Sequence, residues 1–168
     1  MDEFVVADCG IRQLHARFVD AAWRQDPEEF GGCFTRDGEW KIGGMLFAGR
    51  EAIADACVKL LGRCSHIQLI PAPHILEVNG QEAQGRHHML EIARMNDGST
   101  AMTIGIYHDR YAFEDGRWRY KQRFWSLKYR GPADLSGAWV PSPDYGAFPG
   151  GPALDEVTFT SLKPGEGK

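Results

Sequence analysis

Residues 109–123 read DRYAFEDGRWRYKQR and carry the clearest signal for the fold. Residues of strand-forming type lie on both sides of Asp115-Gly116, a dipeptide that supplies the positive φ angles of a tight hairpin. The same kind of turn occurs upstream at Asn79-Gly80 and at Asp97-Gly98. The segments between the turns therefore predict a four-stranded antiparallel meander, with strands over about 66–78, 81–95, 100–113 and 117–129.

The chain before the meander has a helical period. Ile11, Leu14 and Phe18 recur at three- and four-residue steps, which predicts a first helix over about 6–25 whose apolar side faces the sheet. Asp26, followed by Pro27 and by Glu29, is typical of the start of a second, short helix. Farther on, 36–48 predicts a small hairpin and 50–62 a third helix. Helices first and strands afterwards predict a segregated α+β fold.

Composition excludes several classes of protein. The chain has 168 residues, of which 43% are hydrophobic, enough for one domain with its own core. The net charge is −4 and no basic stripe is present, so we expect no nucleic acid partner. No apolar run approaches the length of a membrane helix, and we expect a cytoplasmic protein. Cys9, Cys33, Cys57 and Cys64 form no CxxC pair, which favours reduced core thiols over disulfides or metal ligands.

The composition changes after Tyr129, where Gly, Pro and isolated aromatic residues dominate. Trp139, Tyr145 and Phe148 are costly to leave in water, so we expect residues 131–168 to form a lid or a subunit-contact extension of the same domain. The last six residues, KPGEGK, are expected to be disordered.

The order of elements, together with FTRDGEW at 34–40 and DGRW at 115–118, resembles the NTF2-like superfamily, and in particular its SnoaL-like branch. The resemblance covers residues 1–130, most clearly from about residue 8. It implies a cystatin-like cone, in which a curved antiparallel sheet packs on three N-terminal helices around an apolar pocket. It also implies a homodimer or homotrimer.

Within this branch the chain resembles scytalone dehydratase and hexachlorocyclohexane dehydrochlorinase, which use a His-Asp pair to remove a proton from a small ring. The resemblance implies that the pocket histidine is His66 and that the arginine of the last long strand is Arg123. The position of the helix aspartate holds Trp23, so the His-Asp pair is broken in this chain. Asp20 is the nearest carboxylate, but it is expected on the exposed side of the helix.

Other histidines are candidates for the pocket. His87 and His88 are adjacent on a strand and point to opposite faces, so only one reaches the interior. The alternation does not decide between them, and our prediction is His88. His15 lies beside the apolar stripe of the first helix, where a core-edge role is favoured over a second pocket histidine.

Two more polar residues complete the predicted catalytic set. Arg123 could stabilise a developing negative charge. However, Arg119, Lys121 and Arg123 alternate along the strand, which is typical of a solvent-exposed face. A β-bulge before Arg123 is therefore required to turn its side chain inward. Tyr107 shares a strand face with Asp109 and Tyr111; it either donates to a substrate oxygen or belongs to aromatic sheet packing. The predicted substrate-binding walls are Trp23, Phe18, Trp40, Trp125 and Trp139.

The leading functional hypothesis is a lyase or isomerase that acts without a cofactor on an aromatic or cyclic small molecule. His66 and His88 would move the proton, and Arg123 and Tyr107 would stabilise negative charge. Dehydratase-like elimination and retro-aldol release of an aldehyde are two versions, and a SnoaL-type polyketide cyclase is an alternative. A different class is a non-catalytic ligand-binding or assembly subunit. No phosphate-binding glycine loop, nucleophile elbow or metal-ligand spacing is present, so neither metal nor nucleotide cofactor is expected.

Overall fold

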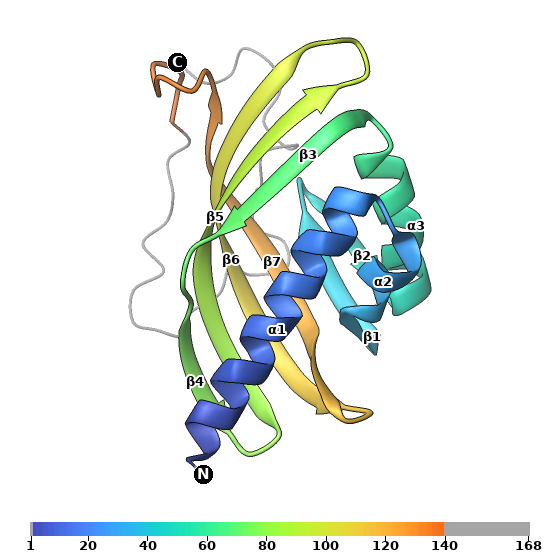
Figure 1. The fold of residues 1–168 in the computed structure, drawn as a ribbon, viewed down its shortest axis with the longest axis vertical. Helices are drawn as coiled ribbons and strands as arrows, with labels where there is room; N and C mark the ends of the chain where they lie inside the picture. The colour runs from blue at the N-terminus through green and yellow to red at the C-terminus, as the bar shows by residue number, and fades with distance from the viewer. Residues whose placement is uncertain (1, 140–168) are drawn as a thin grey trace.

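The computed structural model describes residues 2–139, in which seven strands form one curved sheet (Figure 1). The strand order is β2-β1-β7-β6-β5-β3, and β4 also pairs with β5. All pairs are antiparallel except β1 with β7, which run parallel. The strands are β1 (Phe34–Ile42), β2 (Met45–Ala48), β3 (Cys64–Pro71), β4 (Ile75–Asn79), β5 (Glu82–Met95), β6 (Thr100–Glu114) and β7 (Arg117–Gly131).

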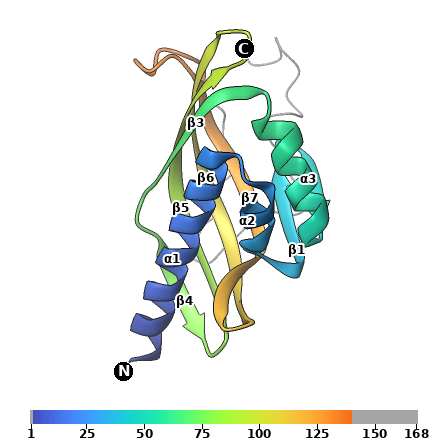
Figure 2. The same cartoon turned by 45° about the vertical axis from the view of Figure 1, so that its right-hand side comes forward.

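Three helices cover the concave face of the sheet. The long α1 (Glu3–Arg24) crosses it diagonally, while α2 (Pro27–Gly32) and α3 (Arg50–Leu61) lie beside β1 and β2 (Figures 1 and 2). The start of α2 is as predicted: the Asp26 carboxylate accepts from the backbone N–H of Glu29 at 3.0 Å, and Pro27 follows the cap. The α+β fold with three N-terminal helices is therefore confirmed.

The first strand of the predicted meander is in fact two strands. β3 and β4 both pair with β5, and the short segment 72–74 separates them. Pro71 is the last residue of β3 and Pro73 lies within the break, and neither has the N–H that a ladder requires. The interruption brings His74 against α1, where its Nε2 lies 2.8 Å from the Asp8 carboxylate.

Two bulges in β7 decide which of its side chains face the helices. Opposite Arg110 and Tyr111 of β6 lie Gln122 and Tyr120, so Lys121 is the extra residue of the first bulge. Opposite Ile104 and Gly105 lie Tyr129 and Leu127, which makes Lys128 the extra residue of the second. Each bulge shifts the two-residue alternation by one position. The bulge required to turn Arg123 inward is thus present.

The core lies between α1 and the sheet. Ile11, Leu14 and Phe18 of α1 are buried there, as their spacing predicts. Cys33, Cys57 and Cys64 are buried free thiols, whereas Cys9 is exposed, because it lies on the outer side of α1; the expectation of a core thiol is wrong for Cys9. No helix within residues 2–139 is long and apolar enough to span a membrane.

Most of the predicted lid lies outside the described residues. Tyr145, Phe148 and the KPGEGK end fall beyond residue 139. Trp139 is described: it forms an isolated bridge with Tyr129, and their ring centroids are 4.9 Å apart.

Candidate functional site

A cavity of about 470 Å³ lies between the concave face of the sheet, α3 and the β1–β2 hairpin. Its aromatic lining comes from Phe18, Phe30, Trp40, Tyr107 and Trp125, and aliphatic side chains of β3, β5 and α3 complete the walls. Its polar lining includes Glu91, Thr103 and Arg130. Such a cavity has the size and character of a site for a small organic molecule.

Tyr107 joins this cavity to a buried charged cluster. The guanidinium carbon of Arg123 lies 3.6 Å from the centroid of the Tyr107 ring, 4.1 Å from that of Tyr120 and 4.4 Å from that of Phe18. Arg123 is 0% exposed. Burial opposes its charge, but Asp109 and the surrounding tyrosines outweigh burial and raise the pKa of Arg123. A permanent positive charge therefore lies directly behind the Tyr107 ring.

Asp109 is the counter-ion of this charge. Arg123 Nη1 donates to Asp109 Oδ2 at 2.9 Å, and the Tyr111 hydroxyl donates to the same oxygen at 3.0 Å. Burial raises the pKa of Asp109 to about 7, against the opposite pull of Arg123 and Tyr111. The second oxygen, Oδ1, has no hydrogen-bond partner among the described residues.

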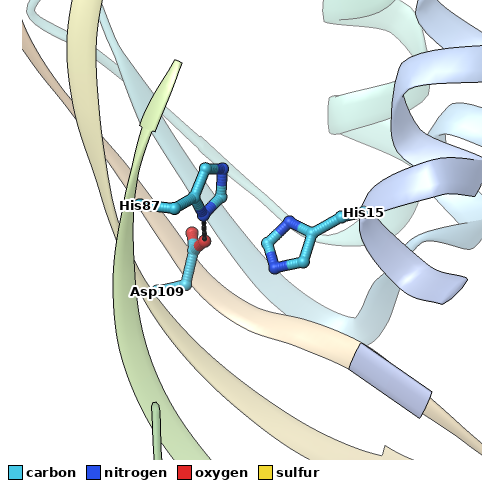
Figure 3. A group of neighbouring side chains, drawn as sticks. All are labelled: His15, His87 and Asp109. Atoms are coloured by element: carbon cyan, nitrogen blue, oxygen red, sulfur yellow. Dashed lines mark ion pairs between the residues drawn. The ribbon is translucent and has the colours of Figure 1, made fainter. Parts of the chain in front are cut away.

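Two buried histidines surround the ion pair. Arg123 Nη2 lies 3.3 Å from His87 Nε2, so this nitrogen is the acceptor and the ring proton is on Nδ1, 3.6 Å from Asp109 Oδ2. His15 approaches from α1, and its ring centroid is 4.3 Å from that of His87. Figure 3 shows His15 pointing from the helix toward the strand residues His87 and Asp109.

The tautomer of His15 follows from its partners. Tyr111 donates to Asp109, so its oxygen accepts from His15 Nε2 at 3.3 Å, and His15 Nδ1 then accepts from the Tyr120 hydroxyl at 3.0 Å. Burial, reinforced by the charges around them, lowers the pKa of both His15 and His87. Both rings are therefore neutral near pH 7.

Within residues 2–139, the side chains that could together bind a metal ion are His15, His87 and Asp109. Ligand atoms of His15, His87 and Asp109 lie within 4.8 Å of one another. Two histidines and a carboxylate suit several divalent metals. However, the guanidinium of Arg123 already contacts both Asp109 and His87, so a divalent cation would lie beside a buried positive charge. The donor set is poorly suited to a metal.

The predicted histidines point the wrong way. His66 is exposed, because a bulge at Ser65 leaves Ile67 and Leu69 as the inward residues of β3. His88 is exposed and His87 is 1% exposed, so the predicted choice between them is wrong. Met89 shares the inward face with His87, and the outer face of β5 carries His88, Leu90 and Ile92.

Two of the predicted wall residues also lie elsewhere. Trp23 is 58% exposed, because it is on the solvent side of α1. Trp139 is 51% exposed and packs on Tyr129, away from the cavity. Phe18, Trp40, Trp125 and Tyr107 line the cavity, and Arg123 lies behind Tyr107.

Sequence reasoning missed several members of the cluster. His15, expected at the edge of the core, is at its centre, and His87, Tyr111 and Tyr120 were not selected as site residues. The shared strand face of Tyr107, Asp109 and Tyr111 was the one available signal. Glu91 carried no signal at all, since a lone Glu in a long strand is usually solvated.

Comparisons with known proteins agree with this architecture. An α+β cone with a cavity between a curved sheet and N-terminal helices is the architecture of the NTF2-like superfamily, and residues 7–123 match the SnoaL-like domain. The chain belongs to the SnoaL-like domain family. It matches no curated protein in sequence.

Solved structures share the fold. A protein of unknown function from Mycobacterium tuberculosis is 28% identical, with TM-score 0.71 and coverage of 82% of this chain and 80% of that one. A candidate scytalone dehydratase from Novosphingobium aromaticivorans is 20% identical, with TM-score 0.71 and coverage of 76% and 87%. Hexachlorocyclohexane dehydrochlorinase LinA-type3 from Novosphingobium barchaimii is 17% identical, with TM-score 0.70 and coverage of 83% and 97%.

Proposed function

We propose that this chain is a lyase or isomerase that moves a proton on an aromatic or cyclic small molecule bound in the cavity. The observation that carries the proposal is the contact between Tyr107, which lines the cavity, and the buried guanidinium of Arg123 behind its ring. It gives an apolar binding site one end that is prepared for negative charge.

The walls favour a flat, apolar substrate. Phe30, Trp40 and Trp125 present aromatic surface, and about 470 Å³ accommodates a molecule of one or two rings. The fold neighbours named as dehydratase and dehydrochlorinase are compatible with this class of substrate.

Tyr107 supplies the stabilising group. Burial raises its pKa to about 12, so at neutral pH it is a hydrogen-bond donor and not a base. When a substrate oxygen gains negative charge, the Tyr107 hydroxyl donates to it and the Arg123 charge acts on it through a dry environment. The histidines maintain this arrangement: His87 contacts Arg123, while His15 holds Tyr120 and Tyr111.

A non-catalytic binding module is the second candidate. It is favoured by two observations. No histidine is among the described residues that line the cavity. The family position of the helix aspartate also carries Trp23, which is exposed. A SnoaL-type cyclase would use the same proton transfer but would then form a carbon–carbon bond within its substrate.

Deuterium incorporation from D₂O tests the proposal without knowledge of the natural substrate. A panel of aryl ketones, aryl diols, cyclic alcohols and halogenated cyclohexanes is incubated with the protein and followed by NMR. We expect exchange or turnover of at least one class, and Tyr107→Phe should lower it by about 10²–10³-fold. The matched control is Tyr129→Phe, whose hydroxyl donates to the Pro132 carbonyl and does not line the cavity.

The outcomes separate the two candidates. Tight binding of a panel compound with neither exchange nor turnover would favour the binding module. Equal rates for Tyr107→Phe and the wild type would remove Tyr107 from the mechanism. The proposed homodimer or homotrimer is measured independently by light scattering.

A further inference from the structure

Three polar side chains lie side by side where neighbouring strands border the cavity. Glu91 of β5 is paired with Thr103 of β6, and Thr103 is paired with Arg130 of β7. All three line the cavity. Arg130 is on this side only because the bulge at Lys128 shifts the alternation of β7. Together, Glu91, Thr103 and Arg130 form a polar row across an otherwise apolar wall.

The hydroxyl of Thr103 indicates that this row binds a polar group of a ligand. The residue is 5% exposed, and within residues 2–139 its Oγ1 has no hydrogen-bond partner. A buried hydroxyl without a partner is unfavourable, and Val would fill the same space without that cost. Because Thr103 lines the cavity and its hydroxyl lacks a partner among the described residues, it is suited to bind a polar group of a ligand.

Glu91 is the only carboxyl group among the described residues that line the cavity. Burial raises its pKa, and Arg130 opposes this shift. The other titratable or charged groups lining the cavity are Arg63, Cys64, Tyr107 and Arg130. A desolvated carboxylate is a stronger proton acceptor than one in water, which is the property required of a general base.

The row and Tyr107 are positioned to act on one molecule. Thr103 and Tyr107 are four residues apart on β6, about 13 Å along the strand. The charge of Glu91 acts on the Tyr107 hydroxyl. A carboxylate that can accept a proton and a hydroxyl that can donate a hydrogen bond therefore line the same cavity.

We propose that Glu91 is the proton acceptor of the reaction, and that Thr103 binds a ring hydroxyl of the substrate, which is an aryl or cyclic ketone. This inference rests on the proposed function. The Glu91 carboxylate takes a proton from the carbon next to the carbonyl, and the electron pair of the C–H bond becomes the C=C bond of an enolate. The carbonyl π electrons move to the oxygen, to which Tyr107 donates. Return of the proton to a different carbon of a conjugated enolate completes an isomerisation. In D₂O, a solvent deuteron replaces the proton on Glu91, and its transfer to the original carbon completes an exchange, so no co-reactant other than water is required.

Acetophenone and its ring-hydroxylated forms are suitable probes, because their methyl protons exchange with D₂O through the same enolate. Glu91→Gln keeps the shape and removes the base, and we expect a loss of about 10²–10⁴-fold in exchange rate with the dissociation constant changed less than threefold. The wild-type rate should fall toward acidic pH as Glu91 becomes protonated, and this limb should be absent in Glu91→Gln. The control is Glu51→Gln, an exposed carboxylate on α3.

Thr103 has a different readout. Thr103→Val should abolish the preference for hydroxylated over plain acetophenone, a loss of about tenfold or more in the ratio of the two exchange rates. Thr103→Ser should restore the preference. A Val variant with an intact preference would overturn the role of Thr103.

The failure of this inference is distinguishable from that of the proposed function. If Tyr107→Phe slows exchange and Glu91→Gln does not, Glu91 is not the acceptor and the proposed function stands. If the wild-type protein exchanges no probe and turns over no compound of the wider panel, both are overturned.

Discussion

The Arg123 guanidinium stacks on the Tyr107 ring with its carbon 3.6 Å from the ring centroid, and this contact exists because of a single extra residue in β7. Without the bulge at Lys121, Arg123 and Tyr120 would lie on opposite faces of the sheet. With it, both side chains are inside, and Arg123 lies on the aromatic rings of Phe18, Tyr107 and Tyr120.

Arg123 and Asp109 should respond unequally to removal of their partner. Asp109→Asn leaves a guanidinium that cannot lose its proton buried without a counter-ion, and we expect a loss of about 3–5 kcal/mol in the free energy of unfolding. Arg123→Met leaves a carboxyl group that can become neutral, since burial already raises its pKa to about 7, so the cost should be smaller. Urea denaturation at pH 7 measures both, and the double variant should be more stable than additivity predicts.

Equal losses of unfolding free energy for Asp109→Asn and Arg123→Met, or additive losses in the double variant, would contradict this prediction. Either result would mean that Arg123 and Asp109 do not stabilise each other's charge.

His15 should make stability depend on pH. Its pKa is lowered in the folded protein, chiefly by burial, and returns to about 6.5 on unfolding. Below that pH the unfolded chain binds a proton that the folded chain does not, so the contribution is complete above about pH 6.5 and is lost as the pH falls. Asp109 acts in the opposite sense, because its raised pKa gives stability that is lost as the pH rises through about 7.

Comparison with His15→Phe isolates the histidine, since Asp109 is present in both proteins. Below pH 6.5, the folding equilibrium constant of the wild type should fall more steeply than that of the variant, by roughly tenfold per pH unit. Parallel curves of unfolding free energy against pH would show that His15 is not buried in its neutral form.

The two adjacent histidines of β5 should differ in their effect on stability. His87 is 1% exposed and contacts Arg123, so His87→Ala leaves a cavity and an unpaired donor, at a cost of more than about 2 kcal/mol. His88 faces solvent, and His88→Ala should change stability by less than about 0.5 kcal/mol. Thermal unfolding measures the pair directly. A similar decrease in melting temperature for both variants would contradict the assignment of His87 to the buried face of β5 and His88 to the exposed face.

The elements of the fold were predictable because local signals specify them. Asp97-Gly98 and Asp115-Gly116 require hairpins, and Asp26 with Pro27 starts a helix whatever surrounds it. The break between β3 and β4 was missed, although Pro71 and Pro73 are a signal for it.

The site was less predictable because it depends on which strand face is inside. A bulge reverses the face for every residue after it, and no local pattern places a bulge at Ser65, Lys121 or Lys128. His66 was therefore assigned to the wrong side, and the inward position of Arg123 could be stated only as a condition. His15 required knowledge of three strands at once, since its partners come from β5, β6 and β7.

Gly105 is the residue on which the cavity wall next to Tyr107 depends. It is buried in β6, and a Cβ there would lie 2.4 Å from two ring atoms of Trp125 and 2.7 Å from the Ser126 carbonyl oxygen. Gly105→Ala must therefore displace the Trp125 ring, which lines the cavity and packs on Tyr107 with centroids 4.7 Å apart. We expect a loss of about 1–3 kcal/mol in the free energy of unfolding and weaker binding of any aromatic ligand, measured by urea denaturation and tryptophan fluorescence.

Gly32→Ala is the matched control, because a Cβ there meets only the flexible end of Arg117 at 3.8 Å. If Gly105→Ala behaves like this control, the Trp125 ring has room to move without loss, and the cavity wall is not fixed by packing against the strand.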